Sequence, residues 1–200
     1  MALLSLPACN GLFESLYDEP AAVDSGFEVV DPAKGTGRIR IDATSYTDWN
    51  YVDLRNRKIT TLPVEAEAPD SWDFAVHRYD AKTNGGAVAE TGSGDFETLA
   101  LPADGYVEDE WTTDRITVDM SHMMDGYLVY ADSYCNAELS KWLDVDTSTM
   151  PPVYTASKRI YALRLQDGTA AALRLTGYMD DAGVKGMLTI DYLYPIEPTP

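Results

Sequence analysis

The sequence predicts an all-β fold, an antiparallel sandwich or distorted barrel built from many short strands. Apolar and polar residues alternate in several runs, such as residues 38–42 and 186–194, and this alternation is the period of a half-buried strand. The pair Asp167-Gly168 separates two such runs, which is typical of a β-hairpin turn. The 13 tyrosines and 4 tryptophans also favour strands, and almost no stretch has a helical period.

Four strands are predicted in the first half of the domain. They are residues 38–42, 46–54, 58–64 and 72–80. The third is shortened by Pro63, because proline cannot donate a hydrogen bond to a sheet. In the fourth strand Trp72, Phe74 and Val76 share one face. Residues 83–86, Thr-Asn-Gly-Gly, close that strand, because Asn and Gly tolerate positive φ.

Further strands are predicted in the second half of the chain. They are residues 115–120, 126–131, 159–165, 172–178 and 186–194, the last two joined by a turn at 180–183. Residues 132–142 are either a short helix or an irregular excursion, since their amphipathic length is small. Residues 143–150 are polar and are predicted to form a loop, which Pro151-Pro152 stiffens at its end.

The charge of the chain excludes one class of partner. The formal net charge is −18, and a surface this acidic repels the phosphates of DNA and RNA, so we expect no nucleic-acid binding. Two hundred residues correspond to one domain or a tight pair. There is no apolar stretch of about 18 residues, so no membrane-spanning helix is predicted.

The first nine residues end in Leu6-Pro7-Ala8-Cys9, which resembles the lipobox of bacterial lipoproteins. In a lipobox, the chain is cleaved before the cysteine and the thiol is acylated. We therefore predict that residues 1–9 are the remnant of a lipoprotein signal, 10–36 an acidic tether, 37–195 the β domain and 196–200 a tail. The basic start of a signal peptide is missing, so we expect the true start to lie upstream. The alternative is a frayed apolar terminus with a chance cysteine.

Soft ligand side chains gather between residues 115 and 154. They are Met120, His122, Met123, Met124 and Met150. Thioether and imidazole groups suit haem iron or copper(I), and suit calcium or magnesium poorly. The alternative is that the methionines fill irregular gaps in a core. The other histidine, His77, lies in mid-strand, where we expect a hydrogen-bonded structural role rather than a ligand.

Four blocks of the sequence carry a family resemblance. They are WDFAVHRYDAKTNGG at 72–86, RITVDM at 115–120, YTASKRIYALRLQDGTAAALRLTGYM at 154–179 and KGMLTIDYLYP at 185–195. In order and spacing these blocks resemble the HmuY family of haem-binding surface lipoproteins, from about Ile39 to Pro195. The resemblance implies a haemophore, anchored by lipid at the outer-membrane surface or shed to the extracellular space. Its implied partners are haem, host haemoproteins and a TonB-dependent outer-membrane receptor.

The resemblance also implies which loops hold the haem. One branch of the family ligates haem through two histidines, and those positions correspond by spacing to Tyr127 and Thr147 here. Neither is a histidine, so bis-histidine coordination at these positions is excluded. Other members of the family place methionines in the same two loops. His122 remains an alternative ligand, because imidazole is the commoner donor to haem iron.

We expect Met150 to be one axial ligand and Met123 or Met124 to be the second. A neutral thioether raises the reduction potential of haem iron, so haem should be held preferentially as Fe(II). Aromatic residues near the loops either wall the haem slot or belong to an ordinary core. They are Trp111, Tyr127, Tyr130, Tyr134 and Trp142. Basic residues nearby are few, Arg115 and Lys141 among them, so the propionates are expected to face water.

Little in the sequence favours catalysis. Its 2 histidines belong to no recognisable nucleophile or metal constellation, and the carboxylates are scattered, so we do not expect an enzyme. The competing prediction is a surface interaction or carbohydrate-binding β-sandwich that holds no haem, since a fold does not determine its function. Exposed tryptophan and tyrosine side chains would stack on sugars in such a module.

Overall fold

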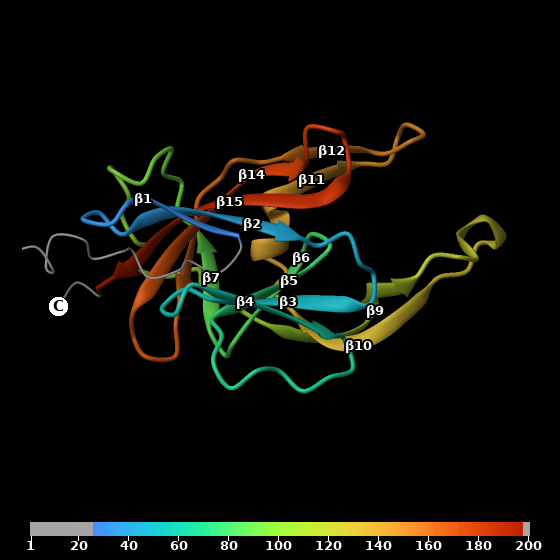
Figure 1. Ribbon diagram of the computed structural model, residues 1–200, viewed down its shortest axis with the longest axis horizontal. Helices are drawn as coiled ribbons and strands as arrows, with labels where there is room; N and C mark the ends of the chain where they lie inside the picture. The colour runs from blue at the N-terminus through green and yellow to red at the C-terminus, as the bar shows by residue number, and fades with distance from the viewer. Residues whose placement is uncertain (1–25, 198–200) are drawn as a thin grey trace, which may run out of the picture.

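The structure is a computed structural model that describes residues 26–197 of the chain (Figure 1). This part of the chain consists of strands, connecting loops and two short 3₁₀ turns. The strands are β1 (Phe27–Asp31), β2 (Thr36–Asp42), β3 (Asp48–Asp53), β4 (Lys58–Pro63), β5 (Phe74–His77), β6 (Asp80–Thr83), β7 (Ala87–Glu90), β8 (Val107–Glu108), β9 (Glu110–Asp119), β10 (Val129–Cys135), β11 (Leu143–Asp146), β12 (Val153–Ala156), β13 (Tyr161–Arg164), β14 (Ala170–Met179) and β15 (Lys185–Ile196). The 3₁₀ turns are η1 (Met123–Asp125) and η2 (Leu139–Trp142). The predicted all-β fold is confirmed.

The strands form two main sheets and two separate hairpins. The larger sheet has seven strands in the order β1-β2-β15-β14-β13-β7-β8, and the smaller has four in the order β4-β3-β5-β6. β9 pairs with β10, and β11 pairs with β12, each as a two-stranded unit. Every pair of neighbouring strands is antiparallel, as predicted.

The main hydrophobic core lies between the two sheets. Ile39 of β2 and Leu173 of β14 come from the larger sheet, and Phe74 and Val76 of β5 come from the smaller one. All four side chains are fully buried. Because burying one large apolar side chain contributes about 1.5–3 kcal/mol, this interface supplies much of the stability of the fold.

The smaller sheet is buried on both faces, which is why β3 and β5 contain no exposed residue. Successive side chains of a strand point to opposite faces, so half of them turn away from the main core. Trp49, Tyr51 and Ala75 form a second core with Ile116 of β9 and Cys135 of β10. The base of the β9–β10 hairpin is therefore packed against the smaller sheet as a third, partial layer.

The C-terminal strands β13, β14 and β15 confirm the meander predicted there. The connection between β13 and β14 is longer than the predicted two-residue turn. The Leu165 N–H donates to the Thr169 carbonyl at 2.9 Å, and the Gly168 N–H donates to the Leu165 carbonyl at 3.1 Å. The loop between Leu165 and Thr169, residues 166–168, is therefore one residue longer than the predicted turn. Gly168 has φ +87°, in the left-handed region that favours glycine.

The folded domain begins before Gly37. β1 lies in residues for which the sequence predicts a tether, and it pairs with β2 at the edge of the larger sheet. The reason is Phe27, which is buried and packs edge-on against Tyr192 at 5.9 Å between ring centroids. Cys9 and the predicted lipobox lie outside the described residues. Within residues 26–197, no helix is long and apolar enough to cross a membrane.

The single strand predicted at residues 72–80 is instead β5 and the start of β6, separated by a turn at Arg78-Tyr79 in which Arg78 has φ +54°. Two further stretches also differ from the predicted elements. Residues 143–156 form the β11–β12 hairpin instead of a polar loop, because Leu143, Val145 and Tyr154 turn inward onto the main core. Residues 132–135 continue β10 instead of starting a helix or excursion, and the following segment folds into η2. Both differences come from side chains whose burial depends on distant parts of the chain.

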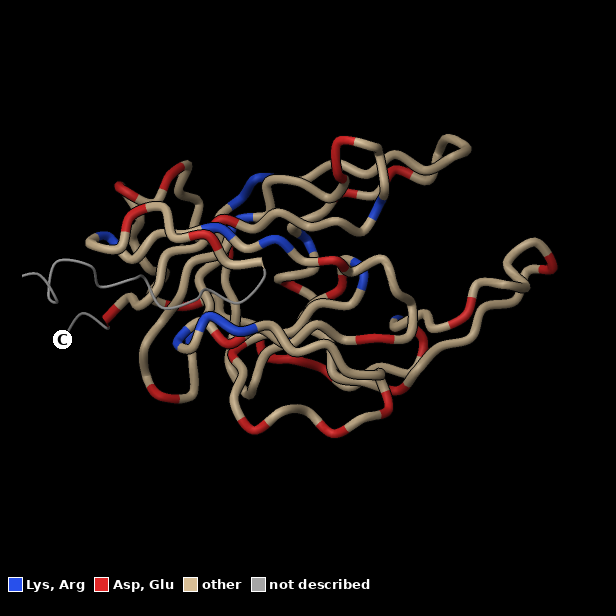
Figure 2. Tube along the Cα trace, in the orientation of Figure 1, with Lys and Arg blue, Asp and Glu red and all other residues tan. Residues whose placement is uncertain are grey.

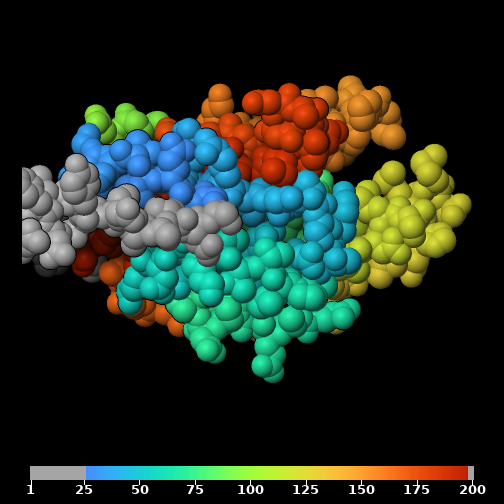
Figure 3. All heavy atoms as spheres, in the orientation of Figure 1, coloured from blue at the N-terminus to red at the C-terminus, as the bar shows by residue number. Residues whose placement is uncertain are grey.

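The β9–β10 and β11–β12 hairpins extend beyond the body of the molecule at the same end (Figure 1). The last residues of β15 lie at the opposite end (Figure 1). We call residues 120–128 the β9–β10 tip and residues 147–152 the β11–β12 tip. The space-filling view shows an open notch between the two tips, drawn in yellow and orange (Figure 3).

Candidate functional site

The methionines indicated by the sequence lie at the two hairpin tips. Met123 and Met124 belong to η1 in the β9–β10 tip, and Met150 lies in the β11–β12 tip. The fold therefore places all three at one end of the molecule, on either side of the notch (Figure 3). The candidate site is this notch.

Backbone hydrogen bonds hold the β9–β10 tip. The Gly126 N–H donates to the Met123 carbonyl at 3.0 Å. Gly126 has φ +77°, in the left-handed region that favours glycine. Asp119 ends β9 and accepts the Ser121 N–H at 2.7 Å. This hydrogen bond favours the ionised carboxylate and lowers the pKa of Asp119.

The β11–β12 tip is held in a similar way. Asp146 ends β11 and accepts the Ser148 N–H at 2.8 Å. Hydrogen bonds from Ser148 lower the pKa of the Asp146 carboxyl. The Thr149 hydroxyl donates to the Pro151 carbonyl at 3.2 Å, across the residue that carries the thioether. Local contacts thus shape the turn on which Met150 is presented.

The two tips share a sequence pattern, Asp-x-Ser-x-Met. It is present as Asp119-Met120-Ser121-His122-Met123 and as Asp146-Thr147-Ser148-Thr149-Met150. In both copies the aspartate ends a strand and accepts the backbone N–H of the serine. Met123 and Met150 therefore occupy equivalent positions in two similar turns, whereas Met124 has no counterpart. This short repeat is a signal, readable in the sequence, that ranks Met123 above Met124.

The three methionines are exposed. Met123 is 46% exposed, Met124 89% and Met150 84%. A methionine that fills a gap in a core is buried, so the core-filling alternative does not account for any of them. Their side chains are therefore open to solvent at the two tips.

The two histidines lie in opposite environments. His122 is exposed in the β9–β10 tip, with its Nδ1 at 3.4 Å from a carboxylate oxygen of Asp125. His77 is buried in β5, and its Nε2 makes a hydrogen bond with the Tyr46 carbonyl at 2.9 Å. Desolvation lowers the pKa of His77, which favours the neutral ring. His77 thus has the structural position expected for it, and only His122 borders the notch.

The aromatic residues near the loops divide between two environments. Trp142 is fully buried in the main core, where its Nε1 donates to the Tyr79 carbonyl at 2.7 Å, so it cannot wall a haem slot. Tyr127 is 59% exposed within the β9–β10 tip. Trp111 and Tyr134 pack edge-on at the base of the hairpin, away from the tip. Of these residues, Tyr127 is the one placed beside the methionines.

An ion pair fixes the base of the β9–β10 hairpin. Arg115 Nε on β9 donates to Asp80 Oδ1 on β6 at 2.8 Å. Asp80 is buried, and desolvation raises the pKa of its carboxyl while Arg115 opposes that effect. The Cys135 thiol on β10 lies 3.9 Å from the same carboxylate, and burial raises the pKa of Cys135 to about 11. These contacts orient the hairpin that carries Met123.

A cluster of three tyrosines supports the base of the β11–β12 hairpin. Tyr154 of β12 stacks on Tyr178 of β14 with ring centroids 5.2 Å apart, and Tyr79 packs edge-on against Tyr178 at 6.0 Å. Lys185 Nζ lies 4.5 Å from the Tyr154 ring centroid and donates to the Pro152 carbonyl at 3.3 Å. The larger sheet therefore positions the loop that carries Met150.

Neither tip offers a positive charge. Residues 116–140 and 143–157 contain no Lys or Arg. Acidic residues occur along both hairpins instead (Figure 2). Arg115 is paired with Asp80 and Lys141 with Glu138, whereas Lys185 lies against the β11–β12 tip, where its Nζ donates to the Pro152 carbonyl. Away from Lys185, carboxylates on a molecule bound in the notch would be directed to water.

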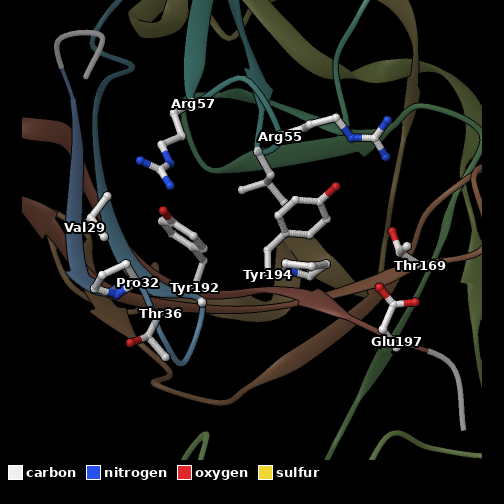
Figure 4. Close-up of a pocket in the computed structure, with 12 residues that line it drawn as sticks. Val29, Pro32, Thr36, Arg55, Arg57, Thr169, Tyr192, Tyr194 and Glu197 are labelled. Carbon is white, nitrogen blue, oxygen red and sulfur yellow. The ribbon is translucent and has the colours of Figure 1, made fainter. Parts of the chain in front are cut away.

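A cavity of about 400 Å³ lies far from the tips, beside the last residues of β15 (Figure 4). Arg57 points toward the hydroxyl of Tyr192 there, and Tyr194 lines the same space (Figure 4). Its lining contains no thioether and no imidazole, so it does not match the predicted ligand chemistry. Across residues 26–197, no group of three or more His, Cys, Asp or Glu side chains is arranged to hold a metal ion.

Comparison with protein families gives one result. The family model described as HmuY protein matches residues 45–192. Among curated proteins, none is similar enough in sequence to match the chain.

Solved structures show the same fold. A candidate lipoprotein from Bacteroides fragilis is 52% identical, with a TM-score of 0.81 over 86% of this chain and 96% of that chain. A candidate HmuY-like haem-binding protein from Bacteroides vulgatus is 53% identical, with a TM-score of 0.80 over 86% of this chain and 99% of that chain. The apo HmuY analogue of Tannerella forsythia is 24% identical, with a TM-score of 0.70 over 82% of this chain and 96% of that chain, and supports the fold alone.

Proposed function

This chain belongs to the HmuY family, and from that membership we propose that it binds haem in the notch between its two hairpin tips. Haem binding is supported at the level of the family, since the similar Bacteroides vulgatus protein is described as a candidate haem-binding protein. The observation that carries the proposal is the exposure of three methionines at the two tips. A soft, accessible donor on each side of a notch suits the two axial positions of haem iron.

Met150 and Met123 are the residues that would hold the haem iron. Both end an Asp-x-Ser-x-Met sequence in which the aspartate accepts the serine N–H, and each lies in one of the two tips. Met124, the neighbouring residue, is the alternative, and His122 is the further one. Haem would supply the redox-active iron, and the chain would supply two neutral sulfur donors. Neutral soft donors favour the lower charge on iron, so ferrous haem is held more tightly than ferric haem.

The function is capture and transfer rather than catalysis. The notch between the two hairpin tips is open to solvent (Figure 3). Haem can therefore enter and leave it without unfolding of the sandwich. Such a site would take haem from host haemoproteins and pass it to a TonB-dependent outer-membrane receptor. Acylation at Cys9, outside the described residues, would tether the protein to the outer-membrane surface, from which it would be shed.

A titration tests haem binding directly. Haem is added stepwise to the haem-free protein, once as ferric haem and once reduced by dithionite, and the absorbance is followed. We expect a sharp Soret band, distinct from that of free haem, which saturates as the site fills. A spectrum that stays that of free haem in both oxidation states would leave the competing class, a haem-free surface module, as the function.

A further inference from the structure

A second cavity, of about 480 Å³, lies at the base of the β9–β10 hairpin. Its lining includes Trp72, Lys82, Asn84, Glu108, Asp109 and Tyr134. None of these residues belongs to either tip, so the cavity is separate from the notch.

The side chain of Lys82 is the unusual feature of this cavity. Its ammonium lies 4.2 Å from the ring centroid of Trp49 and 5.0 Å from that of Tyr51, and it donates to the Tyr51 hydroxyl at 3.1 Å. Among the described residues, no carboxylate lies within ion-pair distance of it. An ammonium has three donors, and one hydrogen bond leaves two for another acceptor. Burial lowers the pKa of Lys82 to about 8 by desolvating the ammonium.

Two aromatic side chains flank the space that Lys82 borders. Trp72 packs edge-on against Tyr51 at 5.1 Å, which holds its ring in place. Tyr134 is 55% exposed and is supported from the side by Trp111, also at 5.1 Å. Both rings therefore present apolar surface at the cavity without being free to collapse into it.

Polar groups around the cavity supply both donors and acceptors. Asn84 uses its amide N–H on the Trp72 carbonyl at 2.9 Å, which leaves its side-chain oxygen as an acceptor. Glu108 adds an exposed carboxylate at the rim. Asp109 is already occupied, since it accepts from Thr83 and Asn136. The two carboxylates at the lining disfavour an anionic ligand, as does the net charge of −18.

We propose that this cavity binds one ring of a neutral saccharide, stacked against Trp72 and Tyr134 and hydrogen-bonded through its hydroxyls to Lys82, Asn84 and Glu108. A sugar ring has apolar C–H faces that match aromatic surface. Its hydroxyls both donate and accept, which suits a lining that contains an ammonium, an amide oxygen and a carboxylate. The protein could then bind a neutral glycan at this cavity and haem at the notch independently.

The experiment uses an array of neutral and acidic glycans, followed by calorimetric titration of the most strongly retained neutral glycan. Lys82→Met removes the donors and keeps the length of the side chain, and Tyr134→Ala removes one exposed ring. Tyr130→Ala is the matched control, because Tyr130 is an exposed tyrosine on the same strand that does not line the cavity. Each variant is first checked for a cooperative thermal transition.

We expect at least one neutral glycan to be retained. Lys82→Met and Tyr134→Ala should each weaken its binding about tenfold or more, while Tyr130→Ala should change it less than about twofold. Haem titration of Lys82→Met should match that of the parent protein. The proposal is overturned if only acidic glycans are retained, if none is, or if both cavity variants bind as the parent does. If Lys82→Met fails to fold, the glycan affinity of Tyr134→Ala alone decides the test, since the Tyr134 side chain is mostly exposed.

Discussion

The buried residue Asp80 contributes to the orientation of a distant loop, the β9–β10 tip. Its carboxylate holds Arg115 of β9 and lies beside the Cys135 thiol of β10, so both strands of the β9–β10 hairpin depend on it. A buried carboxylate is tolerated only while its cation is present. The orientation of the β9–β10 tip therefore rests in part on an ion pair midway along β9.

Arg115→Met should destabilise the protein, because it leaves Asp80 buried without a counter-ion. We expect a loss in the free energy of unfolding on the order of 2–3 kcal/mol, measured by urea denaturation. The matched control is Lys141→Met, which breaks the pair with Glu138, and its cost should be below about 1 kcal/mol because the lysine is exposed. Equal losses in the two variants would contradict the role given to Asp80.

Lys82 should give stability a distinctive pH dependence. Its pKa in the folded chain is about 8, below the ordinary value of 10.5, so between these values the unfolded chain binds more protons. Stability due to this group therefore rises with pH across that window. The unfolding free energy of Lys82→Met minus that of the parent protein should therefore decrease as the pH rises from 8 to 10.5. Denaturation curves that give a constant difference would show that Lys82 is not desolvated.

At the candidate site, the sequence indicated the ligand chemistry but not the environment. The sequence alone allowed a core-filling role for Met123, Met124 and Met150, because a sequence does not show whether a side chain is exposed. The same limit applies to Trp142, which lies close to the loops along the chain but is buried in the main core. The Asp-x-Ser-x-Met repeat, in contrast, is local and could be read from the sequence alone.

Among the elements, the β13–β14 hairpin depends on the backbone conformation of one glycine. Gly168 has φ +87°, and a Cβ added there meets no atom within 4 Å, so the cost of a side chain is conformational rather than steric crowding. Gly168→Val should lower the free energy of unfolding by about 1–3 kcal/mol. Gly94→Val is the control, since Gly94 lies in open space without a positive φ. A thermal melt in which both variants lose the same stability would contradict this explanation.

Strands with alternating side chains were predictable, and strands buried by distant contacts were not. β2 and β15 alternate strongly and were placed within a few residues. β1 is short, and its place in the sheet depends on contact between Phe27 and Tyr192, far away in the sequence. β11 and β12 look polar along the chain because their tip is polar, while the main core that covers their base comes from other strands.

At the scale of the molecule, the sandwich was predictable and the placement of the two tips was not. Strand patterns indicate many of the strands and turns, but the direction of each hairpin depends on packing. The β9–β10 hairpin is set by the second core and the β11–β12 hairpin by the tyrosine cluster on β14. Only the assembled fold places Met123 and Met150 at the same end of the molecule (Figure 1).

Anchoring at Cys9 is tested in cells. With a complete upstream signal and the natural promoter, the mature protein should begin at an acylated Cys9 and partition with membranes. The motivation is the Leu6-Pro7-Ala8-Cys9 sequence. Cys9→Ser should release the protein into the soluble fraction, as judged by fractionation and mass spectrometry. Detection of an unmodified Cys9 in membrane-associated protein would contradict a lipid anchor.

The most direct test of the central claim compares ferrous and ferric haem affinities in methionine variants. The parent protein should bind ferrous haem more tightly, and Met150→Ala and Met123→Ala should each weaken ferrous binding about tenfold or more, equivalent to about 1.4 kcal/mol, and move the Soret band. Met179→Ala, an exposed methionine at the end of β14, should leave both affinities and the spectrum unchanged. Equal ferrous and ferric affinities that Met150→Ala does not alter would contradict haem ligation by the two tips.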